Sequence, residues 1–297
     1  MPSTTTTTTT TTITDPFVAR IPGEVIRLTG AVARRFCNGM YTNNARDLAL
    51  GSGQRTAMLD ERGRLQGVFE LFCESDTRFV CALEGVSADA FRDRYAMYMM
   101  LDDIELDVLD WQIATVQGAA APTQGLVLPR DRSGLGGFDV IGSPETVQRC
   151  IEASGLPRLD ESAVDAIRVR AGHPKWPQDM GPKSLPHELR MRNDYLHFDK
   201  GCYLGQETVN RIDVMGQARR NLAGVRVVGD SVPPSGAEIH DASGKSVGVL
   251  TSPVQTEDLG TIGLAVLKKP ADVPGTSLTV MDGATRWAAL AADLPFR

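Results

Sequence analysis

The chain changes character near residue 220, and this change is the strongest constraint on its fold. After that point, short β-rich segments alternate with turns containing Pro or Gly, and the segments cover residues 223–228, 246–251, 260–267 and 278–281. Short strands at this spacing predict a small all-β barrel or sandwich. Before residue 220, helix and strand patterns are mixed without regular βαβ repeats. That mixture predicts an α+β fold rather than a doubly wound sheet.

Local patterns before residue 220 predict elements of both kinds. Residues 78–83 (RFVCAL) are apolar and β-rich, which is typical of a strand. Ser87 predicts the start of a longer helix. We expect its aromatic and methionine side chains to pack in the core: Phe91, Tyr95, Met97, Met99 and Met100. Residues 173–186 contain four prolines, which predicts a long loop of the kind that often carries function.

Composition excludes several classes of function. The net charge of −6 argues against a surface dedicated to nucleic acid. No run of about 18 apolar residues predicts a membrane span, and the start of the chain lacks the pattern of a secretory signal. We therefore expect a cytoplasmic protein. The unbroken threonine tract at residues 4–12 predicts a disordered tail over residues 1–16.

The cysteines and histidines do not predict a metal site. Five cysteines are scattered through the chain without a CxxC pair, which fits reduced thiols. Three histidines occur within 25 residues (His173, His187 and His197), but their spacing fits no compact ligand set.

The most informative segment is residues 200–207 (KGCYLGQE). Gly201 and Gly205 bracket Cys202 and allow the backbone to turn sharply. Lys200 places a cation near the thiol, and a nearby cation lowers the pKa of a thiol. The alternative is a cysteine that packs as a small apolar residue in a glycine-rich turn.

This segment resembles the K-G-C-Y-x-G-Q-E signature of the YgfZ-type folate-binding family, which is related to the glycine-cleavage T-protein. Other stretches are similar to the same family. They are residues 59–63 (LDERG), 131–132 with 137–138, 185–189 (LPHEL), and Arg211 with Gly216 and residues 220–222. The resemblance covers the chain from about residue 21 to its end.

The resemblance implies an architecture and a role. Two α+β subdomains over residues 17–218 and a C-terminal β-barrel over residues 219–297 would form a ring around a folate pocket. The implied cofactor is tetrahydrofolate. The implied role is assembly or repair of iron–sulfur client proteins, with a link to tRNA modification. The implied partners are folate and client proteins, with no direct nucleic acid contact and no membrane.

The resemblance also implies site residues. Cys202 corresponds to the family cysteine. The residues expected to bind the cofactor are Lys200, Gly201, Tyr203, Gln206, Glu207, Arg211, Arg168 and Arg170. A basic group is expected to capture the carboxylate tail of a folate, the alternative being a solvated surface. It consists of Arg190, Arg192, Lys200, Arg211, Arg219 and Arg220.

Two departures from the T-protein pattern bear on activity. Gln66 and Gly67 occupy the positions of its catalytic carboxylate, and neither supplies an acid. Arg170 stands where that pattern has a glutamate, and a guanidinium cannot accept hydrogen bonds from a pterin ring. We therefore expect weakened folate binding and an accessory protein rather than a classical aminomethyltransferase. The alternatives are a folate-dependent aminomethyltransferase and a ligand-free interaction scaffold of the same fold.

Overall fold

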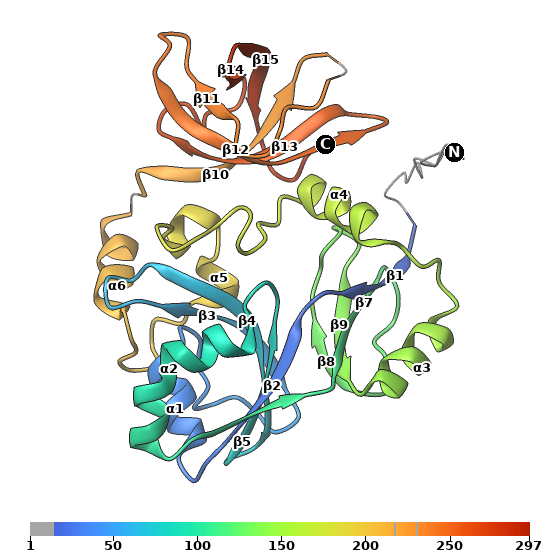
Figure 1. The fold of residues 1–297 in the computed structure, drawn as a ribbon, viewed down its shortest axis with the longest axis vertical. Coiled ribbons are helices and arrows are strands. Elements are labelled where there is room, and N and C mark those ends of the chain that lie inside the picture. The colour runs from blue at the N-terminus through green and yellow to red at the C-terminus, as the bar shows by residue number, and fades with distance from the viewer. Residues whose placement is uncertain (1–14, 217, 230) are drawn as a thin grey trace, which may run out of the picture.

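A computed structural model describes residues 15–216, 218–229 and 231–297. Nearly all of the tail predicted over residues 1–16 lies outside this range. The described chain forms two open sheets that lie side by side, with a closed barrel at one end of them (Figure 1). This is the mixed fold with a C-terminal barrel that the sequence predicts. Within the described residues, no helix is long and apolar enough to cross a membrane.

The first sheet has five antiparallel strands in the order β3-β4-β5-β2-β6. Two helices, α1 and α2, pack on one face of this sheet around an aromatic cluster of Phe36, Tyr41, Phe69, Phe91 and Tyr95. The bounds are β2 (Glu24–Thr29), α1 (Ala33–Met40), β3 (Gly53–Leu59), β4 (Leu65–Ser75), β5 (Arg78–Leu83), α2 (Ala88–Asp102) and β6 (Glu105–Leu109).

The helix predicted from Ser87 forms, but only one of its faces is buried. The Ser87 hydroxyl accepts a hydrogen bond from the Ala90 amide at 3.1 Å, as a helix cap does. Phe91, Tyr95 and Met99 are buried as expected. Met97 and Met100 are exposed, so their prediction as core residues is wrong. Residues four positions apart lie on the same face of a helix, so Phe91, Tyr95 and Met99 face the sheet. Met97 and Met100 lie on other faces and stay exposed.

The second sheet has four strands in the order β1-β7-β9-β8. Strand β1 comes before all strands of the five-stranded sheet in sequence, and β7, β8 and β9 come after them. The chain therefore leaves the second sheet after β1, forms the first sheet, and then returns to the second. Helix α3 packs on its outer face through Val147, Cys150 and Ile151. The bounds are β1 (Phe17–Ile21), β7 (Gln112–Gln117), β8 (Leu126–Pro129), β9 (Gly137–Gly142), α3 (Pro144–Ser154) and α4 (Glu161–Ala171).

The two sheets face each other through an apolar layer. Val25, Phe72 and Val80 of the first sheet pack with Ile113 and Ile141 of the second. Successive side chains of a strand point to opposite faces, so every second residue along these strands faces the same interface. This register also brings polar side chains into the interface, as described below.

Residues 173–185 contain no helix or strand, which agrees with the predicted loop. Short elements follow: η1 (Pro186–Leu189), α5 (Arg192–Tyr195) and α6 (Gln206–Met215). The barrel closes in the order β10-β13-β12-β11-β14-β15. Its strands are β10 (Arg220–Val227), β11 (Glu238–His240), β12 (Ser246–Thr256), β13 (Gly260–Lys268), β14 (Ser277–Asp282) and β15 (Thr285–Ala292). The sequence predicts four of them and misses β11 and β15.

Candidate ligand-binding site

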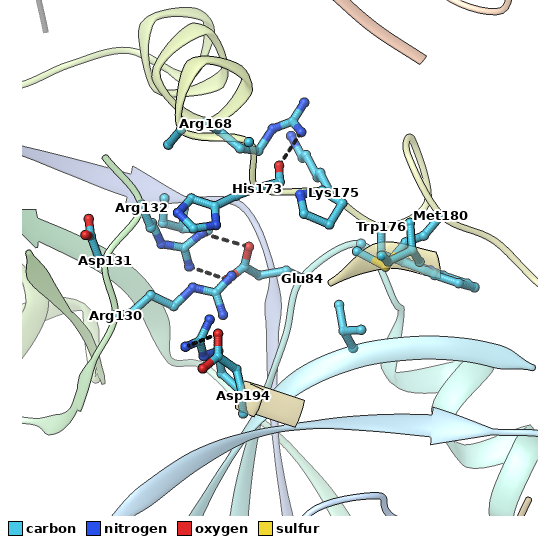
Figure 2. Close-up of a pocket in the computed structure, with 18 of the residues that line it drawn as sticks. Glu84, Arg130, Asp131, Arg132, Arg168, His173, Lys175, Trp176, Met180 and Asp194 are labelled. Carbon is cyan, nitrogen blue, oxygen red and sulfur yellow. Dashed lines mark hydrogen bonds and ion pairs between the residues drawn. The ribbon is translucent and has the colours of Figure 1, made fainter. Parts of the chain in front are cut away.

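A cavity of about 270 Å³ opens between the two sheets, the 173–186 loop and the C-terminal segment. Its apolar wall combines aromatic and aliphatic side chains, namely Val68, Phe69, Trp176, Met180, Leu189, Met191, Tyr195 and Leu294. Figure 2 shows Trp176 and Met180 on one side of this space and charged side chains on the other. An apolar wall with a few polar groups is the usual form of a small-molecule site.

The polar wall carries seven cationic and six acidic side chains. Most of the cations are paired: Arg55 with Asp194 at 3.0 Å, for example. Within the described residues, Arg20 and Arg190 have no acidic partner. Arg20 bonds to Gln148, and Arg190 to the Leu294 carbonyl oxygen at 3.0 Å. The guanidinium of Arg20 is held by Gln148 of α3 and by Gln112, whereas that of Arg190 keeps an uncompensated charge at the cavity that an anionic ligand can bind.

A buried charge cluster forms the inner end of the polar wall. The Nε of Arg132 donates to Asp139 at 2.9 Å, and its Nη1 donates to Glu84 at 3.2 Å. The Nη1 of Arg130 donates to the Oε1 of Glu70 at 3.2 Å. Figure 2 shows Arg130, Arg132 and Glu84 converging beside His173. Three carboxyl groups thus share two guanidinium groups in the protein interior.

The strand register explains how this cluster forms. Glu70 stands two residues from Phe72 on β4, and Asp139 two residues from Ile141 on β9, so both carboxyl groups face the opposite sheet. Arg130 likewise stands two residues after Leu128, which packs in the same apolar layer. Moving along the interface toward the cavity, the apolar layer therefore gives way to charged side chains.

Glu70 is the one carboxyl group of this cluster whose pKa is raised, whereas the pKa values of Glu84 and Asp139 are lowered. Burial, followed by the nearby Asp139 carboxylate, holds the pKa of Glu70 well above its ordinary value, and Arg130 offsets this only in part. The side chain is 2% exposed, and its Oε2 has no hydrogen-bond partner. The three carboxyl groups have the spacing of a cation site, but Arg130 and Arg132 already supply the cations.

His173 faces the same cavity as a neutral group. Burial, followed by the positive charge of Arg130, lowers the pKa of this imidazole to about 4. At neutral pH, it therefore offers one donor and one acceptor rather than a charge. The cavity combines the neutral imidazole of His173 and the buried carboxyl group of Glu70 with the Arg190 guanidinium, which has no acidic partner among the described residues.

The 200–207 segment lies away from this cavity and lines no part of its wall. The Lys200 side chain is 1% exposed, and its Nζ donates to the carbonyl oxygens of Tyr41 and Asn43, the latter at 2.8 Å. It also lies 4.8 Å from the ring centroid of Tyr203. Gln206 is used internally, its Oε1 accepting from the Tyr203 amide at 3.3 Å.

Gly201 and Gly205 both have positive φ, at 92° and 80°, as the turn prediction requires. Cys202 is exposed, whereas the other four cysteines are buried. Glu207 and Arg211 are exposed and line no part of the cavity. The structure thus brings the predicted residues 200–207 together as a turn on the surface, and their contact with a ligand stays a prediction.

Comparisons with known proteins agree with this fold. No protein-family model matches the chain. An uncharacterized protein of Haemophilus influenzae is 25% identical over 263 residues, covering 84% of this chain and 88% of that protein. The glycine cleavage system aminomethyltransferase T of Bartonella henselae superposes with a TM-score of 0.78 at 16% identity, covering 95% of this chain and 86% of that structure.

Two further relatives match in part. The human mitochondrial iron–sulfur cluster assembly factor IBA57 is 34% identical over 134 residues, or 43% of this chain and 35% of that protein. The tRNA-modifying protein YgfZ of Colwellia psychrerythraea is 29% identical over 86 residues, or 29% of this chain and 26% of that protein. The chain therefore has the T-protein fold and is similar in sequence to YgfZ and IBA57 over part of its length.

In this T-protein-like chain, the two predicted departures can be located. Gly67 lies on β4, and a Cβ at this position would overlap Met58 and Val86. A carboxylate side chain at this position would therefore require the side chains of Met58 and Val86 to move. Gln66 donates to the carbonyl oxygen of Leu65 at 2.9 Å.

Arg168 and Arg170 have structural partners in this T-protein-like fold. Arg168 lines the cavity, but its guanidinium is bound to Asp165, Asp179 and Ser252. Arg170 lies outside the cavity wall and pairs with Asp258 of the barrel at 2.7 Å. The expectation that Arg170 weakens a ligand held in this cavity therefore has no structural basis.

The basic group expected to capture a carboxylate tail is mostly engaged elsewhere. Arg192 pairs with Asp213, and Arg220 pairs with Glu188 at 2.7 Å. Of its six members, only Arg190 lines the cavity. Sequence reasoning missed Glu70, Glu84 and Arg130. A usable signal was present, because Glu70 stands alone in the apolar run GVFELF.

Proposed function

We propose that this protein binds a folate, with tetrahydrofolate as the favoured form, in the cavity between the two sheets. We further propose that it acts in the cytosol as an accessory protein in the assembly or repair of iron–sulfur proteins. The observation that carries the ligand proposal is the combination of an apolar and aromatic wall with Arg190, which lacks an acidic partner among the described residues.

Each part of a folate has a matching part of this wall. A flat, partly apolar ring suits the space bounded by Phe69, Trp176 and Tyr195. The carboxylates of a glutamate tail suit guanidinium groups, which bind carboxylates through two parallel hydrogen bonds. The cavity of about 270 Å³ is at the small end of ligand sites, so the ring fits inside and the tail extends outward.

The names of the relatives support the cellular part of the proposal. One relative is named an iron–sulfur cluster assembly factor and another a tRNA-modifying protein. Both matches cover about a third or less of those proteins, so the client proteins are proposed as a class only.

Aminomethyl transfer is the second candidate, because relatives named aminomethyltransferase also match the chain. The one from Bacteroides thetaiotaomicron is 21% identical over 309 residues. The accessory role is favoured, since neither Gln66 nor Gly67 supplies the carboxylate of the T-protein pattern. We expect no transfer of an aminomethyl group to tetrahydrofolate. Turnover in that assay would favour the transferase instead.

Calorimetric titration with tetrahydrofolate tests the ligand and its location. We expect the wild type to bind, and Arg190→Leu to weaken binding about tenfold through the loss of one charged contact. The matched control is Arg211→Leu, which removes an exposed arginine outside the cavity. If Arg211→Leu weakens binding and Arg190→Leu does not, the ligand binds at the 200–207 turn. If the wild type gives no heat and no competition, the folate proposal is rejected.

A further inference from the structure

The outer face of helix α2 is apolar. The helix covers the first sheet on the side away from the second sheet (Figure 1), and its side chains Met97, Met100 and Leu101 are 69%, 74% and 73% exposed. Because these residues are three and four positions apart, the three side chains are neighbours on one face of the helix. Large apolar side chains that gather on a surface are a common sign of an interaction site.

The edge strand β6, which contacts α2, adds to this apolar surface. Its residue Val108 is 54% exposed and stands opposite Ile26 of β2, which packs in the core beneath the helices. Side chains opposite each other in a strand pair point to the same face of the sheet, so Val108 lies on the side of α2.

The same part of the chain carries most of the negative charge of the protein. Residues 88–110, which span α2 and β6, contain seven acidic and two basic residues, a net charge of −5, whereas the whole chain has a net charge of −6. The two basic residues, Arg92 and Arg94, already pair with carboxylates. The apolar face of α2 is therefore set in a strongly acidic surface.

Two of these acidic groups lie where the helix itself disfavours them. Asp102 is the last residue of α2, and Asp103 follows it as the C-cap. The carbonyl groups at the C-terminus of a helix carry a partial negative charge, so a cation is favourable there and an anion is not. No basic residue occupies the last turn of α2. Asp102 pairs with Arg35, but within the described residues Asp103 has no basic partner, so a cation from another molecule would be stabilised there.

These charges decide which kind of partner the face fits. A second copy of this chain would place the same acidic side chains, such as Asp93 and Asp103, against each other, and like charges across an interface are costly. A basic partner has no such cost. A helix suits the geometry, because a stripe of apolar side chains three and four positions apart packs against the matching stripe of a second helix. The flexible methionine side chains adapt to the shape of such a partner.

We propose that the outer face of α2 docks a basic amphipathic helix of a partner protein. The apolar stripe of that helix packs on Met97, Met100 and Leu101, and its lysine or arginine side chains lie beside Asp93 and Asp103. No residue of α2 or β6 lines the ligand cavity, so this surface is separate from it and the inference does not depend on the proposed folate function.

Fluorescence anisotropy of a labelled model helix tests this surface on the full-length protein. The probe is a synthetic amphipathic peptide of leucine and lysine. One comparison peptide has glutamate in place of every lysine, and another has proline in place of a central leucine. We expect both comparison peptides to bind at least about tenfold more weakly than the basic peptide, because the first loses the charge attraction and the second loses the helix. Added salt should weaken the basic peptide, since exposed charges are screened.

Two double variants separate the apolar and the charged contributions. Met97→Gln with Met100→Gln should weaken the basic peptide at least about tenfold, because the interface loses apolar contact area. Both side chains are exposed, so the fold stays intact. Asp93→Asn with Asp103→Asn should weaken it about threefold and reduce the effect of salt. Asparagine also tolerates the positive φ of 52° at residue 103.

The matched control is Val214→Gln with Met215→Gln. These two residues of α6 are 87% and 72% exposed, and they lie outside residues 88–110. The control therefore removes a comparable apolar surface elsewhere on the molecule. It should leave the binding of all three peptides unchanged.

Each contrary outcome overturns the proposal in a different way. A wild type that does not bind the basic peptide, or binds it no better than the Met97→Gln, Met100→Gln variant does, shows that α2 is not the docking face. Equal binding of the proline peptide and the basic peptide shows that the surface does not recognise a helix. Sedimentation of the wild type as a dimer and of the methionine variant as a monomer assigns the face to a second copy of this chain instead.

Discussion

Arg168 and Asp179 form a buried ion pair in which the arginine Nη1 lies 2.6 Å from the aspartate Oδ2. The other oxygen of Asp179 accepts from the Ser252 hydroxyl at 2.6 Å. Arg168 belongs to α4, Asp179 to the 173–186 loop, and Ser252 to β12 of the barrel. This single pair therefore joins three parts of the chain at the edge of the cavity.

Asp179→Ala should strongly destabilise the fold. The change leaves the Arg168 guanidinium buried without its main partner, a loss that typically costs about 3–5 kcal/mol. Urea unfolding measures the free energy difference. The control is Arg35→Ala, which breaks an exposed pair with Asp102 and should cost at most about 1 kcal/mol. Similar losses in both variants would contradict the role assigned to the buried pair.

Cys202 should be the thiol that reacts fastest with an alkylating reagent in the native protein. It is exposed, while Cys37, Cys73, Cys81 and Cys150 are buried. Burial also raises the pKa of Cys37 and Cys81, which reduces their thiolate fraction. Mass spectrometry of each cysteine under native conditions gives the rates. In urea, the five rates should converge, and a native rate for Cys202 no faster than that of Cys73 would refute the prediction.

The same residue offers a test of the cellular role. Cys202→Ser should leave stability and folate titrations unchanged, because the side chain is exposed and lies outside the cavity. It should lower the activity of iron–sulfur enzymes in cells that lack their own homologue. Full rescue by Cys202→Ser would show that the thiol has no part in that role.

Local sequence patterns account for much of the fold. Strand β5 coincides with the predicted residues 78–83, and Ser87 caps α2 as expected. Strand β15 was missed because its inward-facing residues, such as Ala289 and Ala291, are too small to give a strong apolar alternation. The membership of β1 in the second sheet depends on a pairing with the distant strand β7, which no local pattern specifies.

The candidate site was predicted less well, for a related reason. Glu70 and Asp139 come together only because two sheets stack with a particular register, and neither residue shows a partner in its own sequence neighbourhood. Lys200 was expected beside the Cys202 thiol, yet its side chain turns inward to backbone carbonyl oxygens. A conspicuous sequence segment indicated the fold, whereas the cavity depends on long-range packing.

Lys200→Met should destabilise the protein more at pH 9 than at pH 6. Burial lowers the pKa of Lys200 to about 7, from 10.5 for a free side chain. Between these values the unfolded state binds more protons than the folded state, so wild-type stability gains from Lys200 as pH rises. The variant loses that gain. It also leaves the carbonyl groups of Tyr41 and Asn43 without a donor, which should lower the free energy of unfolding by about 1–3 kcal/mol.

Urea unfolding of the wild type and of Lys200→Met from pH 6 to pH 9 gives the difference between their free energies of unfolding. The titrations of other groups largely cancel in this difference. A difference that stays constant from pH 6 to pH 9 would mean that the lysine is charged in the folded state throughout, because both states would then bind the same number of protons.

Gly205→Ala should disrupt the docking of the 200–207 turn. Gly205 has a φ of 80°, and a Cβ there would overlap the carbonyl oxygen of Asp60 in the turn at residues 60–63. Gly216→Ala is the matched control, because Gly216 has a similar φ of 69° and open space around it. The control should lose about 1 kcal/mol from backbone strain alone. Gly205→Ala should lose about 1–3 kcal/mol more, because the two turns must separate. Equal losses in urea unfolding would show that the contact between the turns contributes nothing to stability.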